Sequence, residues 1–145
     1  MKVLLQLVSH ADVIIESQSV GSISYGMLAF VGIEKADTMV SSEKMIDRLI
    51  RYRIFPDENG KTNLDLRAAT GSLLLVPQFT LVADTNQGTR PGFSNGMPPT
   101  EGKHLFSHMV HYAKSNYAKV ESGRYGAHML VQLCNDGPMT FLLES

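Results

Sequence analysis

Short apolar runs, separated by glycine or polar clusters, fill the first third of the chain. Residues 2–8 and 12–16 are rich in residues that favour strands and are separated by Ser9, His10 and Ala11. A third run, residues 27–33, follows a stretch rich in glycine and serine. Runs of this kind are typical of β-strands. We therefore predict three antiparallel strands in this part of the chain.

The next segment changes to a helical period. Between about residues 38 and 53, apolar residues including Met45 and Leu49 recur every three or four positions, with charged residues between them. This pattern predicts an amphipathic helix that ends before Pro56. Residues 57–60, with the sequence Asp-Glu-Asn-Gly, predict a tight turn.

A strongly apolar run at residues 72–76 predicts a further strand, and Pro77 interrupts it. Proline lacks the amide that a central strand donates, so we expect a strand end, an edge or a bulge there. Residues 78–81 resume an extended pattern. Residues 83–99 carry many glycines and prolines and predict a long loop, a kind of segment that often carries function.

The last third of the chain predicts one helix and two strands. Thr100 is the expected N-cap of the helix, whose buried stripe includes Leu105, Met109 and Ala113. Strands are expected near residues 124–133 and 140–143, joined by a turn at 135–138. Strands outnumber helices and do not alternate with them. The pattern therefore predicts a single α+β domain over residues 1–145, with an antiparallel or mixed sheet curled into a barrel-like core and two main helices.

Composition and charge narrow the classes of function. The chain has 145 residues, of which 43% are hydrophobic, enough for one folded domain. Its formal net charge of -1 disfavours a protein that grips long nucleic acid, so no DNA partner is predicted, although contact with one end of an RNA remains open. The N-terminus lacks a signal peptide and no apolar run spans a bilayer. We expect a cytoplasmic protein with no membrane partner.

Several candidate reactive groups have simpler interpretations. His104, His108 and His111 share one helix face, but no cysteine and no carboxylate other than Glu101 accompanies them, so a solvated face is favoured and no metal is predicted. Residues 92–96 spell Gly-Phe-Ser-Asn-Gly, the letters of a nucleophile elbow, but prolines on both sides break the strand-turn-helix context that the elbow requires. The single cysteine, Cys134, is interpreted as a buried inert thiol. No nucleotide-binding motif is present, and no cofactor is predicted.

Two segments remain, residues 77–81 and residues 135–141. By their residues alone, turn chemistry is the favoured interpretation of both. At these segments, however, the chain resembles the D-aminoacyl-tRNA deacylase family, also called D-tyrosyl-tRNA deacylase, whose signatures are a Ser-Gln-Phe-Thr strand end and an Asn-x-Gly-Pro-x-Thr-Phe terminus. Further stretches similar to family sequence occur in family order at residues 52–55, 60–64, 83–85, 88–91, 93–94 and 123–127. The resemblance covers essentially the whole chain.

The resemblance implies an enzyme that hydrolyses the ester bond of D-aminoacyl-tRNA as a homodimer, with each active site at the subunit interface and the aminoacyl-tRNA 3′ end as its partner. Gly137 and Pro138, joined by a cis peptide, would reach from one subunit into the pocket of the other and exclude the side chain of an L-aminoacyl group. Glycyl-tRNA, including glycine mischarged on tRNA-Ala, is the expected secondary substrate.

The resemblance also implies roles around the first segment. The backbone amides of Phe79 and Thr80 are candidates for stabilising the oxyanion. Whether the Thr80 hydroxyl acts as a nucleophile or positions the attacking water is left open. Catalysis by the backbone amides with assistance from the ribose 2′-OH is favoured over either role. Gln78 and Phe79 are expected to shape the pocket for the terminal adenosine. Met129 either lines the same pocket or is a core strand residue.

Two positions depart from the family pattern. Pro77 stands where the first motif usually has serine, and Leu7 stands where many members have arginine. Related deacylases with relaxed chirality also carry a proline in the first motif, whereas Phe79 and Phe141 follow the D-specific pattern. A relaxed-chirality deacylase is therefore the second hypothesis, and a catalytically inactive tRNA-interaction module is the third.

Overall fold

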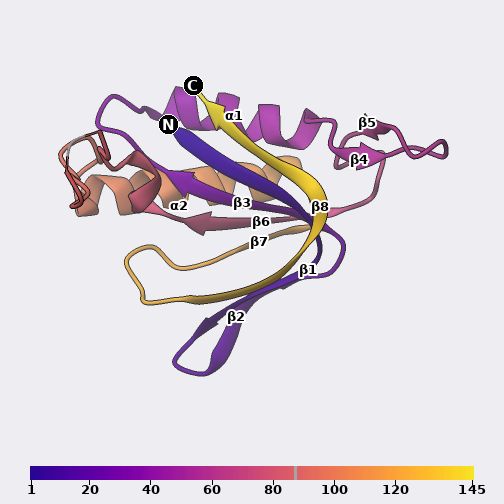
Figure 1. Ribbon diagram of the computed structural model, residues 1–145, viewed down its shortest axis with the longest axis horizontal. Helices are drawn as coiled ribbons and strands as arrows, with labels where there is room; N and C mark the ends of the chain where they lie inside the picture. Colours follow the sequence, from indigo (N-terminus) through magenta and orange to yellow (C-terminus); the bar gives the residue numbers. More distant parts are fainter. Residues whose placement is uncertain (87) are drawn as a thin grey trace.

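The computed structural model describes residues 1–86 and 88–145. A six-stranded mixed sheet forms its centre, with the order β2-β1-β3-β6-β7 and with β8 paired to β1 (Figure 1). Neighbouring pairs are antiparallel except β3–β6 and β6–β7, which are parallel. The strands of this sheet are β1 (Lys2–Ile15), β2 (Gln18–Ile23), β3 (Gly26–Gly32), β6 (Ser72–Pro77), β7 (Val120–Ser122) and β8 (Leu130–Glu144). A two-stranded sheet of β4 (Phe55–Pro56) and β5 (Thr62–Leu64) lies beside it.

Strand β1 is continuous where two separate strands were predicted. Ser9 and His10 are exposed, but they are residues of the same 14-residue strand. The pairing of β1 with β8 shifts register on both sides of Val8, so the polar pair marks a bulge rather than a break. The bend lets the first half of β1 pair with β3 and the second half with β2.

Strands β2 and β7 were not predicted, and their close approach nearly closes the sheet into a barrel. A Cβ placed on Gly21 of β2 would lie only 2.8 Å from the carbonyl oxygen of Ser122 in β7. Only a residue without a side chain allows the two backbones to come so near. The glycine and serine content that hid β2 in the sequence is therefore what permits this closure.

The two helices α1 (Met39–Arg51) and α2 (Pro99–Asn116) pack against one face of the sheet. The prediction for α1 is confirmed: Thr38 caps it by accepting a hydrogen bond from the Ser41 amide, and Met45 and Leu49 are buried. For α2 the predicted N-cap Thr100 is wrong, because the cap is Pro98 and the helix begins at Pro99. Proline suits the first helical position, where an amide would have no intrahelical acceptor. No helix among the described residues is long and apolar enough to cross a bilayer.

The C-terminal part also differs from the predicted hairpin. Instead of two strands joined by a turn at 135–138, β8 is one strand whose two halves both pair with β1. Val8 faces Asn135 while Gln6 faces Thr140, so the intervening residues of β8 form an irregularity without changing the strand's direction. Residues 124–129, predicted as strand, form the loop between β7 and β8.

Candidate active site

A cavity of about 610 Å³ opens where strand β6 ends. Its walls come from the end of β6, the start of the following 3₁₀ turn η1 (Phe79–Val82), the long loop before α2, and the loop between β7 and β8. The lining residues are Pro77, Gln78, Phe79, Phe93, Gly96, Met97, Pro98, Pro99, Tyr125, Gly126, Ala127, His128, Met129 and Val131. Three segments far apart in the sequence, residues 77–79, 93–99 and 125–131, thus build one pocket.

The predicted strand end at Pro77 is confirmed, but the extended pattern predicted for residues 78–81 is wrong. The Gln78 amide donates a backbone hydrogen bond to the Val31 carbonyl of β3 at 2.7 Å. Beyond it the chain turns, and the Leu81 amide donates back to the Gln78 carbonyl at 3.2 Å. The turn carries Phe79 and Thr80 out of the sheet and leaves both exposed.

This turn leaves two backbone donors unused. The first amides of a helical turn have no intrahelical acceptor. Within the part of the chain that the structure describes, the amides of Phe79 and Thr80 have no other hydrogen-bond acceptor either. Two adjacent N–H groups next to the cavity are therefore available to a bound ligand.

The structure brings Gln78, Phe79 and Met129 into the cavity and places Thr80 beside it. Gln78 Nε2 donates a hydrogen bond of 2.5 Å to Thr80 Oγ1, so one lone pair of the hydroxyl is occupied. Met129 is half-buried in the loop before β8, where it lines the pocket and also packs against a cluster of buried core residues.

Gly137 and Pro138 do not line this cavity. Both are exposed in the irregular part of β8, and the peptide bond between them is cis, as the resemblance implied. The side chain of Asn135 supports this segment by donating to the carbonyls of Leu7 and Met139, at 2.9 and 3.2 Å.

The pocket is almost free of ionisable groups. Among the described residues that line it, only Tyr125 and His128 have ionisable side chains, and there is no carboxylate, lysine or arginine. Burial raises the pKa of Tyr125, so its hydroxyl is neutral at physiological pH. The described part of the cavity therefore offers hydrogen bonds and apolar surface but no carboxylate, and neither its histidine nor any carboxylate is hydrogen-bonded to the Thr80 hydroxyl.

Sequence reasoning missed the aromatic residues contributed by the loops. Phe93 packs against Phe79 with ring centroids 5.2 Å apart, and both rings are largely exposed at the cavity. Tyr125 enters from the β7–β8 loop. The glycine and proline content of residues 83–99 indicated a functional loop, but nothing local identified which of its side chains would meet Phe79.

The other candidate groups lie elsewhere. His108 Nε2 lies 2.8 Å from Glu43 Oε1 and joins α2 to α1, while His104 and His111 are exposed. No cluster of three potential metal ligands occurs in residues 1–86 and 88–145. Cys134, predicted to be buried, is exposed, because it lies on β8 beside the bulge of β1.

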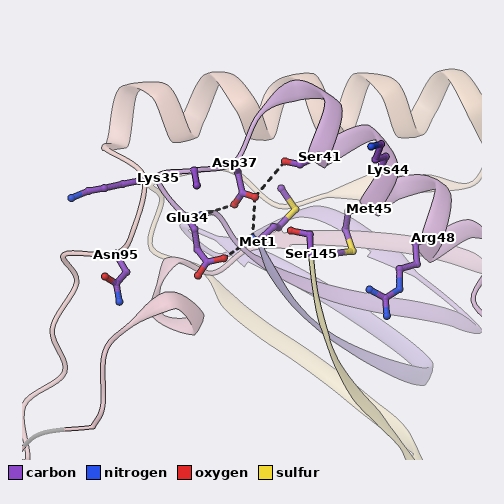
Figure 2. A pocket seen from close by; sticks show the side chains of 11 residues that line it. Met1, Glu34, Lys35, Asp37, Ser41, Lys44, Met45, Arg48, Asn95 and Ser145 are labelled. Carbon is purple, nitrogen blue, oxygen red and sulfur yellow. Dashed lines mark hydrogen bonds and ion pairs between the residues drawn. The ribbon is translucent and has the colours of Figure 1, made fainter.

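A second hollow, of about 780 Å³, lies where the two chain ends meet beside α1 (Figure 2). The Met1 ammonium lies 2.5 Å from Glu34 Oε2 and 2.9 Å from Asp37 Oδ1. Asp37 also accepts hydrogen bonds from the Glu34 amide and the Ser41 hydroxyl. These groups satisfy one another, so this hollow is a structural junction and holds none of the predicted site residues.

Comparison with known proteins agrees with the sequence signatures. The family described as D-Tyr-tRNA(Tyr) deacylase matches residues 4–144. A D-aminoacyl-tRNA deacylase of Marinomonas sp. (strain MWYL1) is 48% identical over 99% of this chain and 100% of its own length. One from Ectopseudomonas mendocina (strain ymp) is 50% identical over 99% of each chain.

Two solved structures share the fold. One, described as c-Myc DNA Unwinding Element Binding Protein, has a TM-score of 0.94 and 30% identity, and the match covers 100% of this chain and 99% of that one. Another, described as a probable eukaryotic D-amino acid tRNA deacylase, has a TM-score of 0.87 at 14% identity, over 98% and 97% of the two chains.

Proposed function

The chain belongs to the D-Tyr-tRNA(Tyr) deacylase family, and we propose that it hydrolyses the ester bond of D-aminoacyl-tRNA to give the free D-amino acid and tRNA. Full-length similarity to curated deacylases supports the reaction class. The observation that carries the proposal is the pair of unused amides, at Phe79 and Thr80, beside a pocket whose described lining has no carboxylate, lysine or arginine. This arrangement suits an ester substrate that is already activated.

The two amides act on the charge that develops during hydrolysis. When water attacks the ester carbonyl, negative charge moves onto the carbonyl oxygen, and fixed N–H groups stabilise it without reorganisation. Each such donor contributes on the order of 3 kcal/mol to the stability of the transition state. In this mechanism Phe79 and Thr80 are catalytic through their main chain.

The Thr80 side chain has a different part in this mechanism. Its oxygen already accepts the hydrogen bond from Gln78, and among the described residues no histidine or carboxylate is hydrogen-bonded to the hydroxyl to take its proton. A hydroxyl without a base is a weak nucleophile. We therefore assign activation of the attacking water to the neighbouring 2′-OH of the terminal ribose, and we assign to Thr80 and Gln78 the shape of the turn.

The pocket fits the terminal adenosine of tRNA. The exposed rings of Phe79 and Phe93 offer a stacking surface, and Met129 adds a polarisable apolar wall. Stacking of one base on an aromatic side chain is worth roughly 1–3 kcal/mol and does not require ionised groups. Gln78, on the same wall, supplies amide groups for hydrogen bonds to the nucleoside.

Chirality is read by Gly137 and Pro138 of a second subunit in the homodimer that we propose. Within one chain these residues are exposed and lie outside the pocket lining, so a motif that reads the substrate in that pocket has to come from another copy. Strand β8 pairs only with β1 among the described strands, and it exposes Leu130 and Leu142 by 59% and 54%. An unpaired strand edge with exposed apolar side chains suits a second copy. Exclusion of L side chains would still admit glycine, so glycyl-tRNA is the secondary substrate.

Two alternatives are kept because Pro77 departs from the usual serine: a deacylase with relaxed chirality and an inactive module that only binds tRNA. The net charge of -1 gives no support to DNA binding. A role in removing mischarged tRNA would place the protein in the cytoplasm.

The test is release of labelled D-tyrosine from D-tyrosyl-tRNA by purified protein with a chelator present. Multiple turnovers are expected, because the proposed chemistry uses backbone amides, water and the substrate's own 2′-OH. Binding of the tRNA without release of the amino acid would contradict the proposal and favour the interaction module.

A further inference from the structure

The sulfur of Met129, in the loop between β7 and β8, occupies a fixed site formed by Gly123 and the Arg124 amide, which we call its seat. Arg124 donates its backbone N–H to Met129 Sδ at 3.4 Å, across the base of the loop. Gly123 is buried, and its own amide donates to the Leu75 carbonyl at 2.9 Å, which fixes Gly123 to β6. The thioether is therefore bound at a point that is itself anchored to the central sheet.

The seat exists because residue 123 has no side chain. A Cβ built on Gly123 would lie 2.8 Å from Met129 Sδ, closer than real Cβ atoms approach a neighbour. Its next neighbours, Pro77 Cδ and Val13 Cγ1, are at ordinary distances of 3.5 and 3.6 Å. Gly123 is not among the glycines with positive φ, so the backbone conformation at this position is compatible with alanine. The Met129 sulfur is then the only close steric obstacle to an alanine side chain among the described residues.

The seat forms part of the pocket wall. Pro77 and Met129 both line the cavity, and each has an atom within 3.5 Å of a Cβ placed on Gly123. A methionine side chain has three rotatable bonds, so a pocket wall formed by methionine ordinarily adapts its shape. The amide of Arg124 and the missing side chain at position 123 select one placement of its sulfur.

We propose that Gly123 is a positioning residue for the substrate: by leaving room for the Met129 thioether beside Pro77, it sets the shape of the pocket wall that receives the aminoacyl-adenosine end. The assignment rests on the proposed function for the identity of that ligand. Gly123 acts only through Met129 and touches neither the substrate nor the two amides that stabilise the oxyanion.

Steady-state kinetics on D-tyrosyl-tRNA test this assignment with four variants. Gly123→Ala is expected to raise KM by about tenfold with little change in kcat, a coupling typical of residues in contact. Met129→Ala is expected to raise KM as well, and adding Gly123→Ala to it should have no further effect, because no sulfur remains to be displaced. Gly92→Ala is the matched control, since its Cβ would meet nothing nearer than 3.8 Å. A Gly123→Ala effect that persists in the Met129→Ala background would overturn the assignment.

A second measurement does not depend on turnover. The protein has eight methionines, so labelling their methyl groups with ¹³C and assigning Met129 with Met129→Leu gives a direct probe. Gly123→Ala should move the Met129 methyl resonance and Gly92→Ala should not, and an unmoved resonance refutes the seat even if D-tyrosyl-tRNA is not a substrate. If Gly123→Ala does not fold, Met129→Leu alone tests the proposal. It removes the sulfur acceptor but keeps a side chain of similar size, and an unchanged KM would reject the role of the thioether.

Discussion

Thr80→Val separates a side-chain nucleophile from backbone catalysis. Valine has nearly the shape of threonine but no hydroxyl, and residue 80 is exposed, so the replacement changes little else. Because the amide of residue 80 is kept, we expect hydrolysis of D-tyrosyl-tRNA to continue.

The magnitude follows from the one hydrogen bond that is lost. Gln78 Nε2 donates to Thr80 Oγ1 at 2.5 Å, and a net hydrogen bond is worth about 0.5–1.5 kcal/mol. If that whole amount positions the turn, kcat falls by roughly two- to tenfold. Removal of an essential nucleophile instead costs on the order of 10⁶ in kcat. The two mechanisms therefore differ by about five orders of magnitude.

The assay is single-turnover release of labelled tyrosine, with mass spectrometry of the quenched enzyme to detect any acyl adduct. Gln78→Leu is the matched partner for the chemical step at saturating enzyme: it removes the donor of the same hydrogen bond and should slow that step similarly, while its lost contacts with the nucleoside should appear in substrate affinity. The double variant should be no slower than either single variant, because the pair acts as one unit. A loss of more than a thousandfold in Thr80→Val, or an acyl group trapped on wild-type Thr80, would refute backbone catalysis.

Three further predictions follow from other contacts. Pro138→Ala should raise hydrolysis of L-tyrosyl-tRNA by about tenfold or more while D-tyrosyl-tRNA is unaffected, and continued rejection of the L substrate would contradict steric exclusion. Tyr117→Phe removes the hydroxyl that donates to the Leu66 carbonyl at 3.0 Å, and calorimetry should show Tm lower by about 3–9 °C for a loss of roughly 1–3 kcal/mol. The hydrogen bond from the Lys61 amide is the main cause that holds the pKa of Asp57 below its usual value. The Asp57 carboxylate therefore stabilises the turn fully at pH values above its unfolded pKa, and this stabilisation is lost as pH falls through its folded pKa. An acid titration that follows the Lys61 amide resonance should report the loss.

The sequence predicted those elements whose signals are local. Helix α1 has its cap at Thr38, a clear apolar stripe and a proline shortly after its end, and it lies where the pattern placed it. The strand end at Pro77 follows from the missing amide of proline. The signatures at residues 77–81 and 135–141 identified the family, because a signature is matched by the order of its residues and does not depend on the three-dimensional structure.

What failed depended on partners distant in the sequence. The polar residues Ser9 and His10 suggested a break, yet pairing with β8 continues on both sides of them. The two halves of β8 looked like a hairpin, and only the length of β1 shows that both pair with the same strand. The meeting of Phe79 with Phe93 arises from packing between segments, which no local period encodes.

The measurement that tests the central claim most directly is the ratio of initial rates for D-tyrosyl-tRNA and L-tyrosyl-tRNA under identical conditions, with glycyl-tRNA as the side-chain-free reference. The account predicts fast release from the D and glycyl substrates and none above the spontaneous rate from the L substrate. Comparable rates for both enantiomers would contradict chiral exclusion and favour the relaxed deacylase.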